Sequence, residues 1–357
     1  MQKVISGIQQ VGIGIPDVQE AWKWYREHFS MDIAAFDDEG TAELMLPYTG
    51  GKPQDRHAIL ALNMKGGGGF EIWQYKSRTP VGPGFDINLG DLGIFAVKIK
   101  TENISEAYHS FNTKNVPVSK RIYEDPNGRK HFFVKDPYGN VFQMVENENW
   151  FVSNQSNTGG ADGVIIGVSD IAKSIQFYKN IFGYDKIIYD AQDKFDEFSG
   201  LKGGNHTFRR VLLTHSKPRE GAFSKLFGSS KIELIQVLDR EPKKIFENRL
   251  WGDLGFIHLC FDIAGMELFR QDCEAAGCPF TVDSRKNGLN GKSFDMGEAA
   301  GDFAYIEDPD GTLIELVEAH RIPLIKKLGW NLDLKKRNRT KALPDWMVKM
   351  LGLKRVK

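Results

Sequence analysis

Apolar and polar positions alternate with a period of two along many short segments of the chain, and each such segment predicts a β-strand. Residues 303–320, FAYIEDPDGTLIELVEAH, show the pattern most completely. A β-prone run ending at Ile306 is followed by Asp308-Pro309-Asp310-Gly311, in which Pro and Gly occupy positions typical of a β-turn. A second β-rich run follows this turn, so the segment predicts two antiparallel strands joined by a tight turn.

A carboxylate interrupts the apolar face of the second of these strands. Leu313, Glu315 and Val317 share one face, because side chains alternate along a strand. Burying Glu315 between two aliphatic side chains is costly unless a cation meets it, whereas on an edge strand it would face water. One glutamate alone leaves both alternatives open.

The same pattern occurs a second time, in residues 132–146, with Gln143 where Glu315 stands. Further blocks repeat between the two halves of the chain, namely 16–29 with 169–182, 70–80 with 232–242, and 92–99 with 254–261. The offset between matching blocks grows from 153 to 162 and then to 172 residues. Two halves of one fold that differ by loop insertions explain this pattern.

Each half divides into two units, and each unit contains a strand, an amphipathic helix and three further strands. The four units span about 5–76, 91–147, 161–238 and 253–319. In the first unit Asp17 is expected to cap a helix with an apolar stripe at Val18, Ala21, Trp22 and Tyr25. In the fourth unit a helix is expected over Met266–Ala276, with Gly277 as its stop.

A βαβββ unit used four times in two tandem pairs resembles the vicinal oxygen chelate superfamily, which includes glyoxalase I, extradiol dioxygenases, methylmalonyl-CoA epimerase and bleomycin-resistance proteins. The resemblance covers residues 5–320 and implies an α+β fold with half-open cupped sheets. It divides the chain into a first glyoxalase-like domain at 1–150, a second at 160–320 and a C-terminal tail at 321–357. It also implies that metal ligands lie on the first and last strands of the units.

The superfamily's ligand positions fall on eight residues, which are Gln10, Ala96, Gly163 and His258 on first strands and Glu71, Gln143, Glu233 and Glu315 on last strands. If each half formed its own sheet, both ligand sets would be incomplete. If the first unit pairs with the fourth, one set has a possible ligand at all four positions. The other set then contains both positions that lack a ligand side chain, Ala96 and Gly163. Four-unit monomeric glyoxalases I have this crossed arrangement as a superfamily trait. The resemblance therefore implies a metal site made of Gln10, Glu71, His258 and Glu315, the ligand order of the eukaryotic type of glyoxalase I.

Three oxygen donors and one imidazole suit a divalent transition metal such as Zn²⁺, Ni²⁺, Co²⁺, Mn²⁺ or Fe²⁺. Gly12 and Gly14 follow Gln10 on the same strand face and are expected to leave room for a ligand. Each ligand position also has an ordinary explanation, because a strand can expose a polar residue and His258 can be a hydrogen-bonded core histidine. Their agreement at matching positions of the repeat favours the metal site.

The resemblance implies a glyoxalase I-like lyase or isomerase that acts on a small α-hydroxy carbonyl or hemithioacetal-like substrate through a metal-stabilised enediolate. Glu315 is the expected base and Glu71 its counterpart on the opposite face of the substrate. The arginines that glyoxalase I uses for glutathione would fall at Gly14 and Leu254, which argues against glutathione. Two alternatives stay open: a metal-free binding protein of the bleomycin-resistance kind, and an Fe²⁺ extradiol-type dioxygenase, for which one of two histidines is missing.

Composition places the chain among globular proteins, with 357 residues, 41% hydrophobic and 26% charged. No apolar run approaches the roughly 20 residues of a membrane helix, and the N-terminus has no signal-sequence pattern. Three cysteines without a CxxC motif are expected to be reduced thiols, and the expected location is cytoplasmic. The expected partner is a small-molecule substrate rather than nucleic acid or membrane, for a monomer or homodimer.

Two further segments and three aromatic residues are expected to bear on the site. Residues 321–357 hold 12 Lys or Arg and 2 Asp or Glu, so this basic tail, with a short helix at Asp345–Leu351, is expected to dock on the acidic body. The glycine-rich segment 283–302 is either a lid or a surface loop. Trp73, Phe256 and Tyr48 either shape an apolar pocket or belong to the core, where aromatic residues at such places are more often found.

Overall fold

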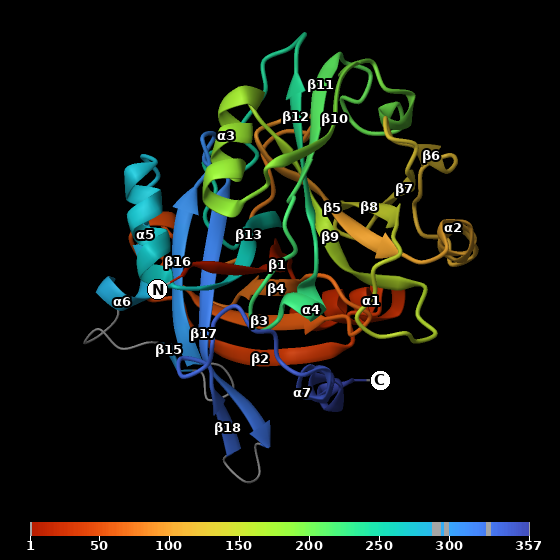
Figure 1. Cartoon of the computed structure of the whole chain (residues 1–357). Coiled ribbons are helices and arrows are strands. Elements are labelled where there is room, and N and C mark those ends of the chain that lie inside the picture. The colour runs from red at the N-terminus through yellow and green to blue at the C-terminus, as the bar shows by residue number, and fades with distance from the viewer. Residues whose placement is uncertain (1, 288–293, 296–299, 326–329, 357) are drawn as a thin grey trace.

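The computed structural model describes residues 2–287, 294–295, 300–325 and 330–356. Two curled sheets dominate it, with helices packed at their outer faces (Figure 1). The first unit contains β1 (Val4–Gly14), α1 (Val18–Phe29), β2 (Ile33–Thr41), the 3-10 helix η1 (Leu46–Tyr48), β3 (Asp55–Leu62) and β4 (Gly69–Tyr75). The second contains β5 (Gly93–Thr101), α2 (Ile104–Thr113), β6 (Tyr123–Glu124), β7 (Lys130–Lys135) and β8 (Val141–Glu146).

The second half repeats this order with insertions. The third unit contains β9 (Thr158–Gly167), α3 (Ile171–Phe182), β10 (Lys186–Asp193), η2 (Asp196–Phe198), β11 (Phe208–Thr214), α4 (Ser224–Phe227) and β12 (Lys231–Val237). The fourth contains β13 (Gly255–Ala264), α5 (Met266–Ala275), β14 (Val282–Asp283), α6 (Ser284–Asn287), β15 (Phe294–Asp295), β16 (Ala300–Glu307) and β17 (Leu313–Ile325). The tail contributes β18 (Trp330–Asp333), α7 (Asp345–Lys349) and η5 (Met350–Lys354).

The helix signals in the sequence have the physical effect that was expected of them. The Asp17 carboxylate accepts hydrogen bonds from the backbone N–H groups of Gln19 and Glu20 at 2.9 and 3.0 Å, so two unpaired donors at the start of α1 are satisfied. The predicted stripe of α1 is buried, with Phe29 added to it. Helix α5 begins at Met266 as predicted and ends one residue before the predicted boundary.

The crossed pairing of units is confirmed. One sheet has the order β14-β16-β17-β13-β1-β4-β3-β2 and joins the first unit to the fourth; the other has the order β10-β11-β12-β9-β5-β8-β7-β6 and joins the second to the third. Strands β1 and β13, the first strands of their units, pair antiparallel at the centre of the first sheet. We call these the outer sheet and the inner sheet, because they take the outer and inner units of the chain.

Hydrogen bonds between consecutive units connect the two sheets. The Tyr25 hydroxyl on α1 donates to Asp136 in the turn of the second unit at 2.7 Å, and Tyr178 on α3 donates to Asp308 in the turn of the fourth unit at 3.1 Å. Both pairs are buried. The repeated tyrosine and the repeated DPxG turn therefore form hydrogen bonds between the outer and inner sheets, which explains why both features recur together in the sequence.

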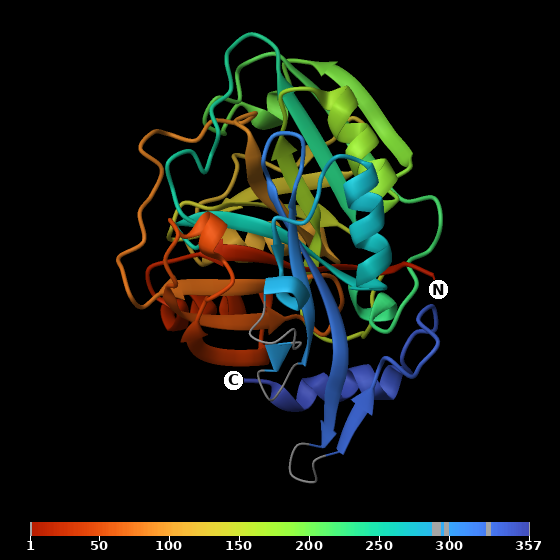
Figure 2. The ribbon, with the colours of Figure 1, turned by 90° about the vertical axis from the view of Figure 1, so that its left-hand side faces the viewer.

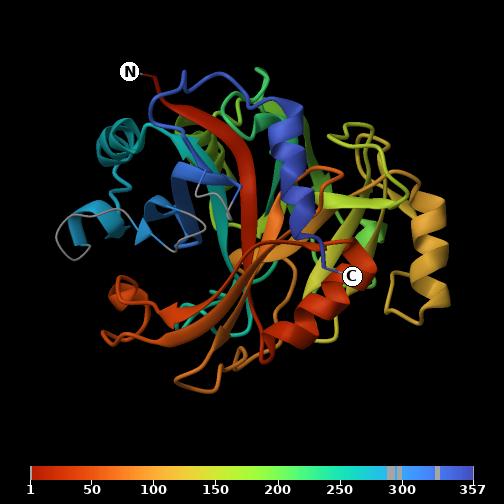
Figure 3. The same ribbon diagram turned by 90° about the horizontal axis from the view of Figure 1, so that it is seen from below.

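The basic tail packs on the body, as expected. Leu343 and Val348 are buried in an apolar cluster with Leu60 and Leu62 of β3. The Arg355 guanidinium lies 3.2 Å from the carboxylate of Asp32. In Figure 3, which shows the molecule from below, helix α7 lies on the side of the first unit that faces the viewer. Figure 2 shows β17 and β18 extending together beyond the body. The tail is thus an integral part of the fold.

Two other expectations concern the same half of the chain. The glycine-rich segment 283–302 lies partly outside the described residues, at 288–293 and 296–299, so its role as a lid stays a prediction. Among the residues that the structure describes, no helix has the length and apolar character needed to cross a membrane.

Candidate metal centre

Four neighbouring strands of the outer sheet bring the four predicted ligands together. In the order β17-β13-β1-β4, these strands carry Glu315, His258, Gln10 and Glu71. Gly12 of β1 pairs with His258 on one side and with Glu71 on the other, which sets these two side chains at the same height. The first and fourth units, separated by about half of the chain, therefore contribute two residues each to what we call the ligand cluster (Gln10, Glu71, His258 and Glu315).

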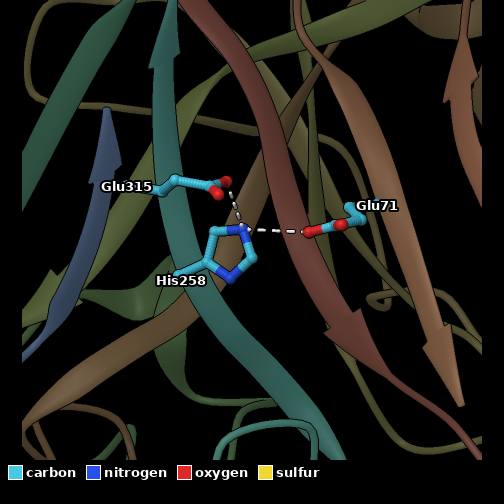
Figure 4. A group of neighbouring side chains, drawn as sticks. All are labelled: Glu71, His258 and Glu315. Carbon is cyan, nitrogen blue, oxygen red and sulfur yellow. Dashed lines mark ion pairs between the residues drawn. The ribbon is translucent and has the colours of Figure 1, made fainter. Parts of the chain in front are cut away.

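The polar atoms of the ligand cluster converge on a small volume. The Nε2 atom of His258 lies 3.3 Å from Oε2 of Glu71 and 3.2 Å from Oε2 of Glu315. Both carboxylates point at this nitrogen, Glu315 from one neighbouring segment and Glu71 from another (Figure 4). The Gln10 amide donates to Oε2 of Glu315 at 3.1 Å. One ligand atom from each of Glu71, His258 and Glu315 lies within 4.8 Å of the others, a spacing that a single cation can bridge.

Buried polar atoms with no hydrogen-bond partner test whether these residues suit a metal. Within the described part of the chain, Gln10 Oε1 and His258 Nδ1 are buried without such a partner, while His258 Nε2 and Glu71 Oε2 contact each other without the geometry of a hydrogen bond. Buried polar atoms normally have one, because leaving them unpaired costs about 1–3 kcal/mol each. The unpaired atoms are the donor types that a divalent transition metal binds, so the ligand cluster fits a metal ion.

The two carboxylates also determine the charge of the imidazole. Burial lowers the pKa of His258, but its contacts with Glu315 and Glu71 raise it more, to about 9. The ring is fully buried. An imidazolium between two carboxylates is therefore the expected state at neutral pH when no other cation is present, and a metal ion entering the cluster has to replace that proton.

The space beside Gly12 and Gly14 differs from the expectation. A Cβ atom at Gly12 would lie 2.4 Å from the His258 ring, and one at Gly14 would lie 2.0 Å from the backbone oxygen of Asp253. The absent side chains thus make room for the imidazole and for the loop before β13, and the prediction of a ligand beside these glycines was wrong. Gly12 remains necessary to the site, since any larger residue would displace His258.

Tyr305 is a site residue that the sequence reasoning missed. It faces Glu315 across the β16–β17 pair, and its ring lies edge-on to His258 with centroids 5.5 Å apart. Burial raises the pKa of the Tyr305 hydroxyl well above its usual value, and the nearby Glu315 and Glu71 carboxylates add to this. Tyr305 and Glu315 lie at matching distances before and after the DPDG turn, and this spacing could have identified Tyr305 as the neighbour of Glu315. Trp251, in the loop before β13, stacks parallel to His258 at 6.3 Å.

The ligand cluster borders a cavity of about 440 Å³. Glu71, Glu315 and Gln10 contribute to its surface, together with Trp73, as predicted. The other two predicted aromatic residues have different positions. Phe256 belongs to the apolar core and the Tyr48 hydroxyl donates to Glu307 at 2.7 Å, so within the described residues neither lines this cavity.

The inner sheet holds a different arrangement at the corresponding positions, where Ala96, Gly163, Gln143 and Glu233 stand. The Lys98 ammonium reaches the amide oxygen of Gln143 and lies 2.5 Å from Oε2 of Glu233. The Arg210 guanidinium donates to the other oxygen of Glu233 at 2.8 Å. Burial raises the pKa of Glu233, but Arg210 and Lys98 lower it more, so that it lies well below its usual value. Fixed cations therefore neutralise this carboxylate.

Comparisons with known proteins agree with this architecture. Two family models described as Glyoxalase/Bleomycin resistance protein/Dioxygenase superfamily match residues 7–144 and 162–294. Glyoxalase I from Zea mays is 13% identical and superposes with a TM-score of 0.53, over 89% of this chain and 92% of its own. A point mutant of the same maize enzyme gives 0.54 at 13% identity, over 88% and 94% of the two chains. A Bacillus subtilis protein with a provisional dioxygenase name gives 0.55 at 11% identity, over 100% and 98%.

No curated protein matches the chain in sequence. At 11–13% identity the structural neighbours establish the fold alone. The two family models together cover most of the chain, and the chain belongs to the glyoxalase/bleomycin resistance protein/dioxygenase superfamily. The predicted fold class, two cupped sheets built from four βαβββ units, is confirmed.

Proposed function

We propose that this protein is a divalent-metal-dependent lyase or isomerase of glyoxalase I-like type, acting on a small substrate with two adjacent oxygens. The observation that carries the proposal is the convergence of the ligand cluster beside a cavity of about 440 Å³. Oxygen and nitrogen atoms that converge on one point, next to a space that a small molecule can enter, are typical of a catalytic metal site rather than of a structural ion pair.

The four residues of the ligand cluster would hold the ion. One imidazole with three oxygen donors favours Zn²⁺, Ni²⁺, Co²⁺, Mn²⁺ or Fe²⁺ over Mg²⁺ or Ca²⁺. When bound, such an ion supplies Lewis-acid polarisation of the two adjacent oxygens of a substrate.

Glu315 is the base in this proposal. Its carboxylate takes the proton from the carbon that bears the hydroxyl group, the C–H electron pair forms a C=C bond, and the carbonyl π electrons move to oxygen. The protonated Glu315 then returns the proton to the former carbonyl carbon while the hydroxyl proton passes to the other oxygen, which restores a C=O bond. Glu71 contacts the same His258 nitrogen from a different strand, and in this proposal it serves the other face of the substrate. Tyr305, whose raised pKa keeps its hydroxyl neutral, can donate a hydrogen bond beside Glu315.

Glu315→Gln tests the assignment of the base. We expect the variant to keep near-stoichiometric metal, because the amide oxygen can still act as a ligand, and to lose proton transfer by about 10²-fold or more. Metal is measured by elemental analysis after reconstitution. Proton transfer is measured by NMR, as exchange of the C–H hydrogen of 2-hydroxyacetophenone with solvent deuterium. The exposed Glu27 on α1 offers a matched control, because Glu27→Gln makes the same change away from the cavity.

Two results would contradict the proposal. Deuterium exchange that is equally fast in wild type and Glu315→Gln would remove Glu315 from the role of base. Oxygen consumption with a catechol, in protein reconstituted with Fe²⁺, would favour the dioxygenase alternative instead.

A metal-free binding protein is the second candidate function. The observation that favours it is the pKa of about 9 for His258, since the protonated ring balances the adjacent carboxylates without any metal. Metal analysis separates the two candidates. Less than about half an equivalent of metal after reconstitution with each of the five ions would support the binding protein, given the affinity expected of four convergent ligands.

A further inference from the structure

The cavity that borders the ligand cluster has a cluster of polar groups at one place and a mostly apolar wall elsewhere. Glu71, Glu315 and Gln10 present carboxylate and amide groups at one place. Most of the remaining wall is aromatic or aliphatic, and it includes Phe36, Leu44, Trp73, Trp251 and Phe303. Arg56, Arg321 and Lys354 also reach this wall, but its surface is mostly apolar. A charged or peptide-like substrate body would therefore lose hydration over most of the wall without gaining hydrogen bonds there.

Part of this wall comes from segments outside the two units that supply the ligand cluster. The third unit contributes Phe223, Leu226 and Phe227, from α4 and the residue before it, and the tail contributes Leu351. These segments are inserted between the repeated strands or follow them, so they can vary without disturbing the metal centre.

The added wall is held firmly in place. Leu226 and Phe227 are buried in one apolar cluster with Val348 of the tail. The Gly67 N–H donates to the Leu226 carbonyl at 2.8 Å, and the Leu343 N–H donates to the Ala222 carbonyl at 2.9 Å. The cavity wall is therefore formed before any substrate arrives, which lowers the cost of ordering it on binding.

We propose that this cavity selects substrates whose two adjacent oxygens are attached to an apolar group about the size of an aromatic ring, and that Leu351 of the tail is a specificity-determining residue. The proposal rests on the proposed function only for the two oxygens; the apolar group is argued from the wall alone. A volume of about 440 Å³ lies within the range of roughly 300–1,000 Å³ typical of small-molecule sites.

The test compares two α-hydroxy ketones that differ only in this group, 2-hydroxyacetophenone with a phenyl ring and hydroxyacetone with a methyl group. Binding to the full chain is measured by calorimetry, with Zn²⁺ and after chelator treatment. We expect the phenyl compound to bind about tenfold or more tightly than the methyl compound in both forms, because the ring buries more apolar surface.

Leu351→Ala should reduce the preference for the phenyl compound about threefold or more while changing the binding of hydroxyacetone little, because the lost methyl groups contact only the larger ligand. Leu351→Trp should also reduce the preference, by narrowing the cavity. Leu353 lies two residues further on and is 81% exposed, so Leu353→Ala is the matched control and should leave both affinities unchanged.

Equal affinities for the two ketones in wild-type protein would overturn the proposal, and so would an unchanged preference in a natively folded Leu351→Ala variant. A phenyl preference that persists in chelator-treated protein and in Glu315→Gln supports the proposal even if no metal-dependent turnover is found. Proton exchange that is equally efficient with both ketones would instead leave the proposed function intact and refute the inference about the cavity.

Discussion

Raising the pH from 7 to 9 should strengthen metal binding to the chelator-treated protein about fiftyfold. The pKa of His258 is raised to about 9, so a metal ion that binds the ring below this pH has to displace its proton. At pH 7, two units below the pKa, about one ring in a hundred is neutral, which costs about 2.7 kcal/mol of metal-binding free energy. The gain should level off above pH 9, because half of the rings are neutral at that pH and nearly all of them about one pH unit higher.

Two measurements give this dependence. Competition for Ni²⁺ with a chelator of known affinity at each pH gives the metal affinity. The slope of its logarithm against pH should be close to one between pH 7 and 8 and fall to about one half at pH 9. Calorimetry at pH 7 in two buffers of different ionisation enthalpy counts released protons, and about one proton per metal ion is expected.

His258→Gln provides the control, because glutamine offers an amide oxygen that has no proton to lose. The variant should bind Ni²⁺ more weakly than the wild type does at pH 9, and its affinity should not depend on the ionisation of residue 258. A wild-type affinity that is flat from pH 7 to 9, or an equal slope in the variant, would refute the assignment of the proton to His258.

Two further predictions concern stability. Lys98→Met should lower the free energy of unfolding in urea by about 3 kcal/mol, because it removes one cation from the buried Glu233 carboxylate. The same change at the exposed Lys202 is the control. An unchanged free energy of unfolding in Lys98→Met would show that Arg210 alone neutralises Glu233. Burial raises the pKa of the Asp262 carboxyl to about 7, so the folded state favours its protonated form and stability should fall as pH rises from 4 to 7. Asp262→Asn should remove this fall, on the order of 2–4 kcal/mol, and an unchanged pH profile would contradict it.

The repeat could be found in the sequence because its signals are local. The helix cap at Asp17, the alternation in β17 and the DPxG turns each depend on a few neighbouring residues. The crossed pairing of units is not local. It was predicted from the ligand positions that the superfamily resemblance implies, because only the crossed pairing gives a complete set, Gln10, Glu71, His258 and Glu315. Its confirmation by the sheet order shows that the positions of polar residues can determine topology where hydrophobic periodicity cannot.

Several features of the site could not be predicted in this way. Gly12 was expected to leave space for a ligand, but the space is filled by His258 from a strand that is about 250 residues away in sequence. Leu351 lines the cavity because the tail folds back under β3, and no periodic pattern specifies that position. Both depend on which segments meet in space, and the sequence pattern near each residue contains no information about its distant neighbour.

The two sheets show why only one of them is a plausible place for an exchangeable cation. Both sheets carry glutamates on last strands and must neutralise them: the partly buried Glu71 and the buried Glu315 in the outer sheet, and the buried Glu233 in the inner one. In the inner sheet, Lys98 occupies the position that pairs with Gln143, and its tethered ammonium cannot leave. In the outer sheet the same position is Cys260, which carries no charge, and the neutralising group is the imidazolium of His258. A proton on an imidazole can be exchanged for a metal ion at accessible pH, whereas a lysine side chain cannot, so metal chemistry is expected in the outer sheet alone.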